Sequence, residues 1–282
     1  MSFLTVKFLK YHALGNDYLI INPQSIKYHL TKNIIQSICD RKFGVGSDGI
    51  LYGPFSYKTK IFFRIFNPDG SEAEVSGNGI RIFALHLYKN KYVKNKKFTL
   101  HTQSGPSYIT IANKKQHLLK ISLKNYFLIR HALPYLYTQQ KLFFSNIKFA
   151  DKNTNIYCVN IGNPHCVLFQ HKVNTFITKK FGPLIEKNPN FPNRINVQFV
   201  EVINRNNIKV EIWERGAGYT LASGSSSAAA CYVAYKLNLI EQKITAHMPG
   251  GILSIEIHNN HIYLIGTGNK IMQGRAYVNI LS

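Results

Sequence analysis

A stretch near residue 70 recurs 147 positions later, and this internal repeat constrains the fold more than any other feature. The first copy, residues 67–79, reads NPDGSEAEVSGNG, and the second, residues 214–226, reads ERGAGYTLASGSS. Each copy follows a run of β-branched and aromatic residues that predicts a strand. Each also passes through glycine-rich turn residues to a Ser-Gly pair and precedes an apolar run that predicts a helix. One shared dipeptide would mean little, but Gly15-Asn16 and Gly162-Asn163 have the same offset of 147. The spacing predicts a duplicated unit of about half the chain.

The length of 282 residues is sufficient for two domains with their own cores. We predict a first half of residues 1–125 completed by the tail 269–282, and a second half of residues 126–268. Apolar content of 45% and aromatic content of 13% indicate a globular chain. Without an apolar run of roughly 20 residues or a signal peptide, we expect no membrane partner and a cytoplasmic location.

A formal charge of +22 raises the question of nucleic-acid binding. The basic residues are scattered along the sequence, and their densest runs, residues 89–97 and Lys114-Lys115, fall where surface turns are expected. A proteome rich in Lys, Asn and Ile would give the same charge, so we expect no nucleic-acid partner. The four cysteines have no metal-ligand spacing and lie in apolar surroundings, which predicts buried free thiols and no metal site.

The repeated stretch has a chemical consequence, because the first amides of a helix have no acceptor within the helix and form an anion site together with the helix dipole. Two such helix starts could hold one carboxylate through the amides of Gly77, Asn78, Gly224 and Ser225. Ser76 and Ser223 would then approach the adjacent carbon from opposite faces, which suits the removal of a proton on one side and its return on the other. The alternative is that both serines are helix N-caps, and the local pattern by itself favours that role.

The sequence around these positions strongly resembles the diaminopimelate epimerase family of cofactor-independent amino-acid epimerases. The motifs that carry the resemblance span nearly the whole chain: residues 12–17 (HALGND), 39–46 (CDRKFGVG), 64–72 (RIFNPDGSE), 162–165 (GNPH), 196–197 (NV) and 214–218 (ERGAG). The resemblance implies an α/β (α+β) fold of two pseudo-symmetric halves, each with strands wrapped around a central helix and with the active site in the cleft between them. It implies an isomerase of amino-acid and lysine biosynthesis that needs no pyridoxal phosphate or other cofactor and acts on a diaminopimelate-like amino acid. Family members often form homodimers.

The resemblance also implies roles for individual residues. In the family, three asparagines, an arginine and a glutamate hold the unreacting end of the substrate, and a further asparagine belongs to the pocket. The matching residues in this chain are Asn67, Asn163, Asn196, Arg215, Glu214 and Asn16.

At the reacting end, the family has two acid/base cysteines where this chain has Ser76 and Ser223. The neighbours Tyr219 and Ser225-Ser226-Ser227 are also unusual, so we interpret the serines as natural divergence. A thiol ionises near pH ~8.5, whereas a serine hydroxyl is a poor base unless another group takes its proton. His165, Glu74, Glu214 and Tyr219 are candidates for that assistance, and His165 is best matched to neutral pH. We therefore expect an epimerase or racemase. The alternatives are an isomerase or dehydratase with one assisted base and a catalytically silent amino-acid-binding homologue.

Overall fold

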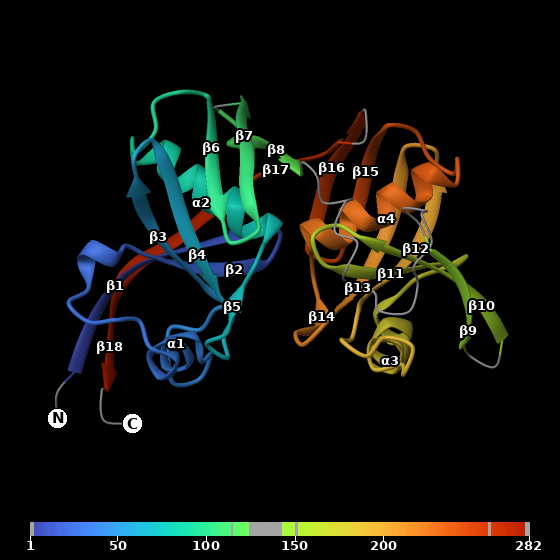
Figure 1. The fold of residues 1–282 in the computed structure, drawn as a ribbon, viewed down its shortest axis with the longest axis horizontal. Helices are drawn as coiled ribbons and strands as arrows, with labels where there is room; N and C mark the ends of the chain where they lie inside the picture. The colour runs from blue at the N-terminus through green and yellow to red at the C-terminus, as the bar shows by residue number, and fades with distance from the viewer. Residues whose placement is uncertain (1–2, 114, 124–142, 150–151, 259–260, 280–282) are drawn as a thin grey trace. The chain divides into compact units, whose positions relative to one another are not determined.

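A computed structural model describes residues 3–113, 115–123, 143–149, 152–258 and 261–279. The chain divides into two compact units. Unit 1 comprises Met1–Ile121 and Gly266–Ser282, and unit 2 comprises Ser122–Ile265. Each unit contains strands, one surface helix and one central helix (Figure 1).

Unit 1 begins with a strand pair and a surface helix and continues through a strand array around its central helix. Its elements are β1 (Phe3–Ala13), β2 (Asn16–Ile21), a 3-10 turn (Pro23–Ser25), α1 (Lys32–Cys39), β3 (Ile50–Tyr57), β4 (Lys60–Phe66), β5 (Glu72–Ala73), α2 (Gly77–Lys89), β6 (Lys97–Thr102), β7 (Gly105–Asn113), β8 (Leu118–Leu123, which ends beyond the unit boundary) and β18 (Asn269–Asn279). The tail strand β18 pairs with β1 along ten register positions, so the C-terminal segment completes this unit.

Unit 2 repeats the plan. Its elements are β9 (Phe143–Phe149), β10 (Lys152–Asn160), β11 (Pro164–Phe169), α3 (Thr175–Glu186), β12 (Asn196–Asn204), β13 (Asn207–Glu214), β14 (Gly218–Thr220), α4 (Gly224–Lys236), β15 (Lys243–Met248), β16 (Gly251–His258) and β17 (His261–Gly266). Six strand pairings of unit 1 recur in unit 2 with the same order and the same parallel or antiparallel sense. They are β1–β2 as β10–β11, β2–β3 as β11–β12, β3–β4 as β12–β13, β4–β5 as β13–β14, β4–β6 as β13–β15 and β6–β7 as β15–β16. The strand β9 occupies against β10 the place that β18 takes against β1.

The central helices α2 and α4 show the duplication most directly. Both have 13 residues, and both their first and their last residues are 147 positions apart. In α2 every residue from Gly77 to Leu87 is buried, and α4 is similarly buried from Ser226 to Ala234. A helix that is buried on all sides belongs to a core rather than to a surface. The predicted fold of strands wrapped around a central helix in each half is confirmed.

The surface helices α1 and α3 each begin at a side-chain cap. The Thr31 hydroxyl accepts from the Ile34 amide at 3.4 Å, and the Asn174 side chain accepts from the Ile177 amide at 2.9 Å. Their apolar sides pack on the two clusters of buried residues that fill the space between helix and strands, with Ile34, Ile35 and Ile38 in one and Ile185 in the other.

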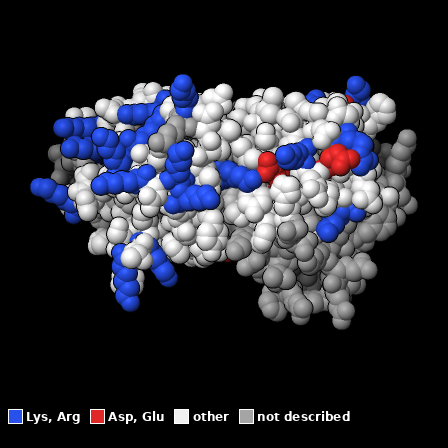
Figure 2. All heavy atoms as spheres, turned by 90° about the horizontal axis from the view of Figure 1, so that it is seen from above, with Lys and Arg blue, Asp and Glu red and all other residues white. Residues whose placement is uncertain are grey.

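The predicted boundary between the halves, at residues 125 and 126, lies outside the described residues. Figure 2 shows Lys and Arg side chains spread over one face with few acidic ones among them. In the described part of the chain, no helix combines the length and the apolar character that a membrane crossing requires.

Candidate active site

Ser76 caps the central helix of unit 1. Its backbone is extended (φ −142°, ψ 115°), and its Oγ accepts a hydrogen bond from the Gly79 amide at 3.0 Å. Gly79 leaves little room at this turn, because a Cβ there would lie 3.0 Å from Leu51 and 3.2 Å from Ser76. The predicted capping role is therefore present, and it fixes the Ser76 hydroxyl at the positive end of α2.

Ser223 caps α4 in the same way, with φ −142° and ψ 128°. Its Oγ accepts from the Ser226 amide at the longer distance of 3.4 Å and lies 3.4 Å from the Ser225 hydroxyl. The side chain is only 6% exposed. The two serines thus share a position, a backbone conformation and a bonding pattern, but the contacts of Ser223 are looser.

Tyr18 is a contact of Ser76 that the sequence did not single out. The two hydroxyl oxygens are 3.0 Å apart, and Tyr18 is 7% exposed. Tyr18 lies in β2, two residues after Asn16. Because alternate residues of a strand share a face, the spacing of Tyr18 and Asn16 was the signal that could have placed both near the helix start.

Asn16 and Asn78 join in unit 1 as predicted pocket residues. The Asn78 Nδ2 donates to Asn16 Oδ1 at 3.0 Å, and the Asn16 amide donates to Asp48 at 2.9 Å. The fully buried Arg81 donates to Asn78 Oδ1, which fixes the orientation of this amide. Burial lowers the pKa of Arg81 to about 10, and its Nε and Nη1 have no partner among the described residues.

A network of charged side chains lies next to Asn16 in unit 1. Arg41 Nη2 lies 2.6 Å from Asp17 and 2.7 Å from Asp48, and Lys10 Nζ lies 3.0 Å from Asp17. Burial opposes ionisation of Asp17, but hydrogen bonds and charge from Arg41 and Lys10 outweigh it and lower the pKa of this carboxyl. The network ties the turn between β1 and β2 to the loop before β3.

Asn67 is the unit 1 site residue that the structure leaves separate from this cluster. It follows β4 in an exposed turn, where its side-chain amide donates to Ser71 Oγ at 3.0 Å. No hydrogen bond among the described residues joins it to Asn16, Asn78 or Ser76.

The predicted substrate-binding residues of unit 2 form a continuous group. His165 Nε2 lies 2.7 Å from Asn163 Oδ1, and His165 pairs with Asn196 across the parallel β11–β12 ladder. The Asn196 side chain donates to the Pro164 carbonyl at 2.8 Å and accepts from the Arg215 amide at 3.0 Å. The order of strands therefore gathers residues that are up to 52 positions apart in sequence.

His165 differs from the sequence-based expectation, because its pKa is not near neutrality. The ring is fully buried, and burial lowers its pKa to about 3, an effect that the Gln198 side chain offsets only in part. Nδ1 has no hydrogen-bond partner among the described residues. His165 is therefore neutral at physiological pH. Because the Asn163 oxygen must accept, His165 Nε2 carries the proton.

The other candidate bases have different surroundings. Glu214 accepts from Thr220 Oγ1 at 3.1 Å, next to Arg215. Tyr219 donates to Glu211 at 2.9 Å and lies 3.0 Å from the Thr175 hydroxyl, and burial raises its pKa, which makes it a weaker acid. Glu74 is exposed. All four cysteines are buried free thiols, as predicted.

Comparison with known proteins identifies the family of the chain. Residues 8–124 and 157–275 match the diaminopimelate epimerase family. The chain is 46% identical to diaminopimelate epimerase 2 of Nostoc sp., with 98% of each chain covered. It is 36% identical to diaminopimelate epimerase of Methanococcus maripaludis over 95% of this chain and 99% of that one. A solved hydroxyproline epimerase from Agrobacterium vitis has a similar fold, with a TM-score of 0.68 at 9% identity and coverage of 98% and 94%.

The family match covers most of the chain in two blocks that correspond to the repeated halves. The curated relatives match along nearly their full length. The chain is therefore an isomerase of the amino-acid epimerase and racemase type, and it belongs to the diaminopimelate epimerase family.

Proposed function

We propose that this protein inverts the Cα of a diaminopimelate-like amino acid, with Ser76 and Ser223 as the acid/base residues on the two faces of that carbon. The observation that carries the proposal is the equivalence of the two serines. Each is the cap of a buried central helix at the same position of a duplicated unit, and each Oγ already accepts from a helix amide. The curated relatives named diaminopimelate epimerase supply the substrate class.

The substrate would be held at both ends by groups of known chemistry. The amides of Gly77, Asn78, Gly224 and Ser225, at the two helix starts, suit the carboxylate beside the reacting carbon. Asn67, Asn163, Asn196, Glu214 and Arg215, together with Asn16, would bind the distal amino-acid group. His165 is a positioning residue in this proposal: by donating to Asn163 Oδ1, it leaves the Asn163 NH2 group to donate elsewhere.

Tyr18 gives Ser76 the proton partner that a serine needs. When Ser76 Oγ takes the Cα proton, its own proton passes to the Tyr18 oxygen, which must first be ionised. In the reverse direction, Ser76 gives a proton to Cα, and Tyr18 restores it. A phenol ionises near pH ~10, several units below an alcohol, so the tyrosinate is the accessible base of the pair. The Ser76 proton moves to it only in concert with capture of the Cα proton by Ser76 Oγ, so that no free serine alkoxide forms. Among the described residues, the side chain in the equivalent place beside Ser223 is the Ser225 hydroxyl, at 3.4 Å.

Proton NMR in heavy water with LL-diaminopimelate tests the proposal, because it follows loss of the Cα proton and formation of the meso isomer together. We expect both, with a rate that rises toward alkaline pH. Ser76→Asn and Ser223→Asn should abolish inversion while keeping a capping side chain. Thr31→Ala, which removes the cap of α1 in the same unit, is the matched control and should leave the rate unchanged.

The variant carrying both Ser76→Cys and Ser223→Cys should be much faster, since thiolates form near neutral pH. Exchange without inversion would replace the proposal with a single-base isomerase or dehydratase that acts from the Ser76 side. Saturable binding without exchange, in the parent and in the folded double-cysteine variant, would indicate an amino-acid-binding homologue.

The expected cytoplasmic location, a homodimer and the absence of nucleic-acid and membrane partners remain proposals. Size-exclusion chromatography with light scattering tests the homodimer directly. Co-purification with nucleic acid or lipid would contradict the expected absences.

A further inference from the structure

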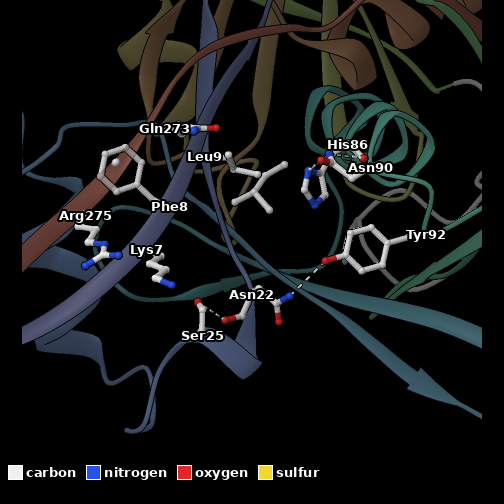
Figure 3. Close-up of a pocket in the computed structure, with 12 residues that line it drawn as sticks. Lys7, Phe8, Leu9, Asn22, Ser25, His86, Asn90, Tyr92, Gln273 and Arg275 are labelled. Carbon is white, nitrogen blue, oxygen red and sulfur yellow. Dashed lines mark hydrogen bonds between the residues drawn. The ribbon is translucent and has the colours of Figure 1, made fainter.

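A cavity of about 500 Å³ lies in unit 1 at the C-terminal end of α2, outside the group of residues assigned above (Figure 3). The helix has 13 residues, so this end is roughly 20 Å from the Ser76 cap. The volume is within the range of small-molecule sites, roughly 300–1,000 Å³. The cavity therefore has room for a ligand of its own.

The floor of the cavity is one face of three adjacent strands. Leu9 of β1 lies opposite Ile20 of β2, and Lys7 lies opposite Arg275 of β18. Leu9 and Lys7 alternate with the buried Val6 and so share the face that is turned away from the α1 core. The floor is thus apolar at one end and cationic at the other.

The cationic end has no counter-charge in the described part of the chain. Lys7 and Arg275 are both exposed and directly opposed across an antiparallel pair, an arrangement that is unfavourable for like charges. Neither forms an ion pair with a described carboxylate, and no Asp or Glu lines the cavity. An anion between the two side chains would relieve their repulsion.

The far end is made by His86 and Tyr92. His86 is 5% exposed, and its Nδ1 accepts from the Asn90 side chain at 3.0 Å, so the proton of this ring is on Nε2. Nε2 points into the cavity, where no described residue accepts its proton (Figure 3). The Tyr92 hydroxyl accepts from Asn22 at 3.4 Å, which joins the helix side of the cavity to the strand side.

The two ends differ in the charge that they accept. Burial and Lys270 lower the pKa of His86 to about 4, so the imidazole is neutral at pH 7. The negative end of the α2 dipole disfavours an anion next to His86. A ligand charge therefore belongs between Lys7 and Arg275, and a neutral hydrogen-bond acceptor belongs at His86.

We propose that this cavity binds a small organic acid, with its acid group between Lys7 and Arg275, its apolar body on Leu9 and Ile20, and a neutral acceptor at His86 Nε2. The inference is independent of the proposed function, because no residue of the cavity belongs to the acid/base or substrate-binding set.

The probe 1-anilino-8-naphthalenesulfonate tests the proposal on the full chain, since it combines an anion with an apolar aromatic body and fluoresces when bound. We expect saturable binding at one site per chain. Lys7→Glu and Arg275→Glu should each weaken it about tenfold or more. Lys97→Glu, an exposed lysine in β6 that does not line the cavity, is the matched control for net charge and should bind like the parent.

Two further measurements distinguish this site from non-specific binding to an apolar surface. The neutral analogue N-phenyl-1-naphthylamine should bind more weakly than the sulfonate, and Lys7→Glu should leave its binding unchanged. Leu9→Trp should fill the floor and abolish binding of both probes, with circular dichroism reporting that the variant is folded. Equal binding of the two probes, or a sulfonate affinity that Lys7→Glu and Lys97→Glu change alike, would overturn the proposal.

Discussion

Acidification should destabilise unit 2 through one buried histidine. The pKa of His165 falls from an ordinary 6.5 to about 3 because the ring is fully buried. At a pH between these two pKa values, the unfolded chain therefore binds a proton on His165 that the folded chain does not bind. Stability that is fully present above pH 6.5 is lost as the pH falls toward 3.

The size of the effect follows from the two pKa values. At pH ~5 the unfolded imidazole is almost fully protonated and the folded one is almost fully neutral, which costs about 2 kcal/mol of unfolding free energy relative to pH ~7.5. With a urea m-value of about 2 kcal/mol/M, the midpoint should fall by roughly 1 M. His165→Gln should lack this part of the loss, because a Gln side chain can still donate to Asn163 but does not titrate.

The assay is urea unfolding followed by the fluorescence of Trp213, the single tryptophan of the chain. Trp213 packs in the buried cluster of unit 2, and its Nε1 donates to Glu186 at 2.8 Å, so its emission reports the unit that holds His165. His29→Gln, at an exposed histidine of unit 1, is the control and should respond to pH as the parent does. If the parent and His165→Gln lose the same free energy within about 0.5 kcal/mol, His165 titrates normally and the reasoning from burial fails.

Three other predictions rest on single contacts. Tyr18→Phe should slow Cα–H exchange at least about tenfold with unchanged circular dichroism, and it should have little further effect in a Ser76→Asn background; additive effects would show that the two hydroxyls act independently. Gly182→Ala should destabilise unit 2 by about 1–3 kcal/mol, because the added Cβ would lie 2.6 Å from Trp213, and a parental urea midpoint would contradict this. Asp17→Asn should lower the unfolding free energy of unit 1 by about 1–2 kcal/mol, since it leaves Lys10 without a carboxylate partner and Arg41 with Asp48 alone, and thermal unfolding at low and high salt measures the loss.

The sequence by itself determined the duplication, the type of each central element and the placement of the serines at helix starts. These features are local: a Ser-Gly pair before an apolar run specifies a capped helix wherever it occurs. The constant offset of 147 then implied that both halves share one topology, and the matching boundaries of α2 and α4 agree with that. The same local patterns, with the motifs of the resemblance, also supplied Ser76, Ser223 and the proposed substrate-binding set, but not Tyr18.

Only the tertiary structure decided the contacts that give those residues their properties. The hydroxyl beside Ser76 comes from Tyr18, 58 positions away, and no spacing rule pairs them. The low pKa of His165 depends on complete burial between β11, β12 and α4, whereas a histidine in a turn motif suggested a group that titrates near neutrality. The cavity at the end of α2 exists because β18, from the last residues of the chain, places Arg275 opposite Lys7. Helix starts and strand patterns are encoded by neighbours in sequence, but desolvation and proton partners depend on packing between distant segments.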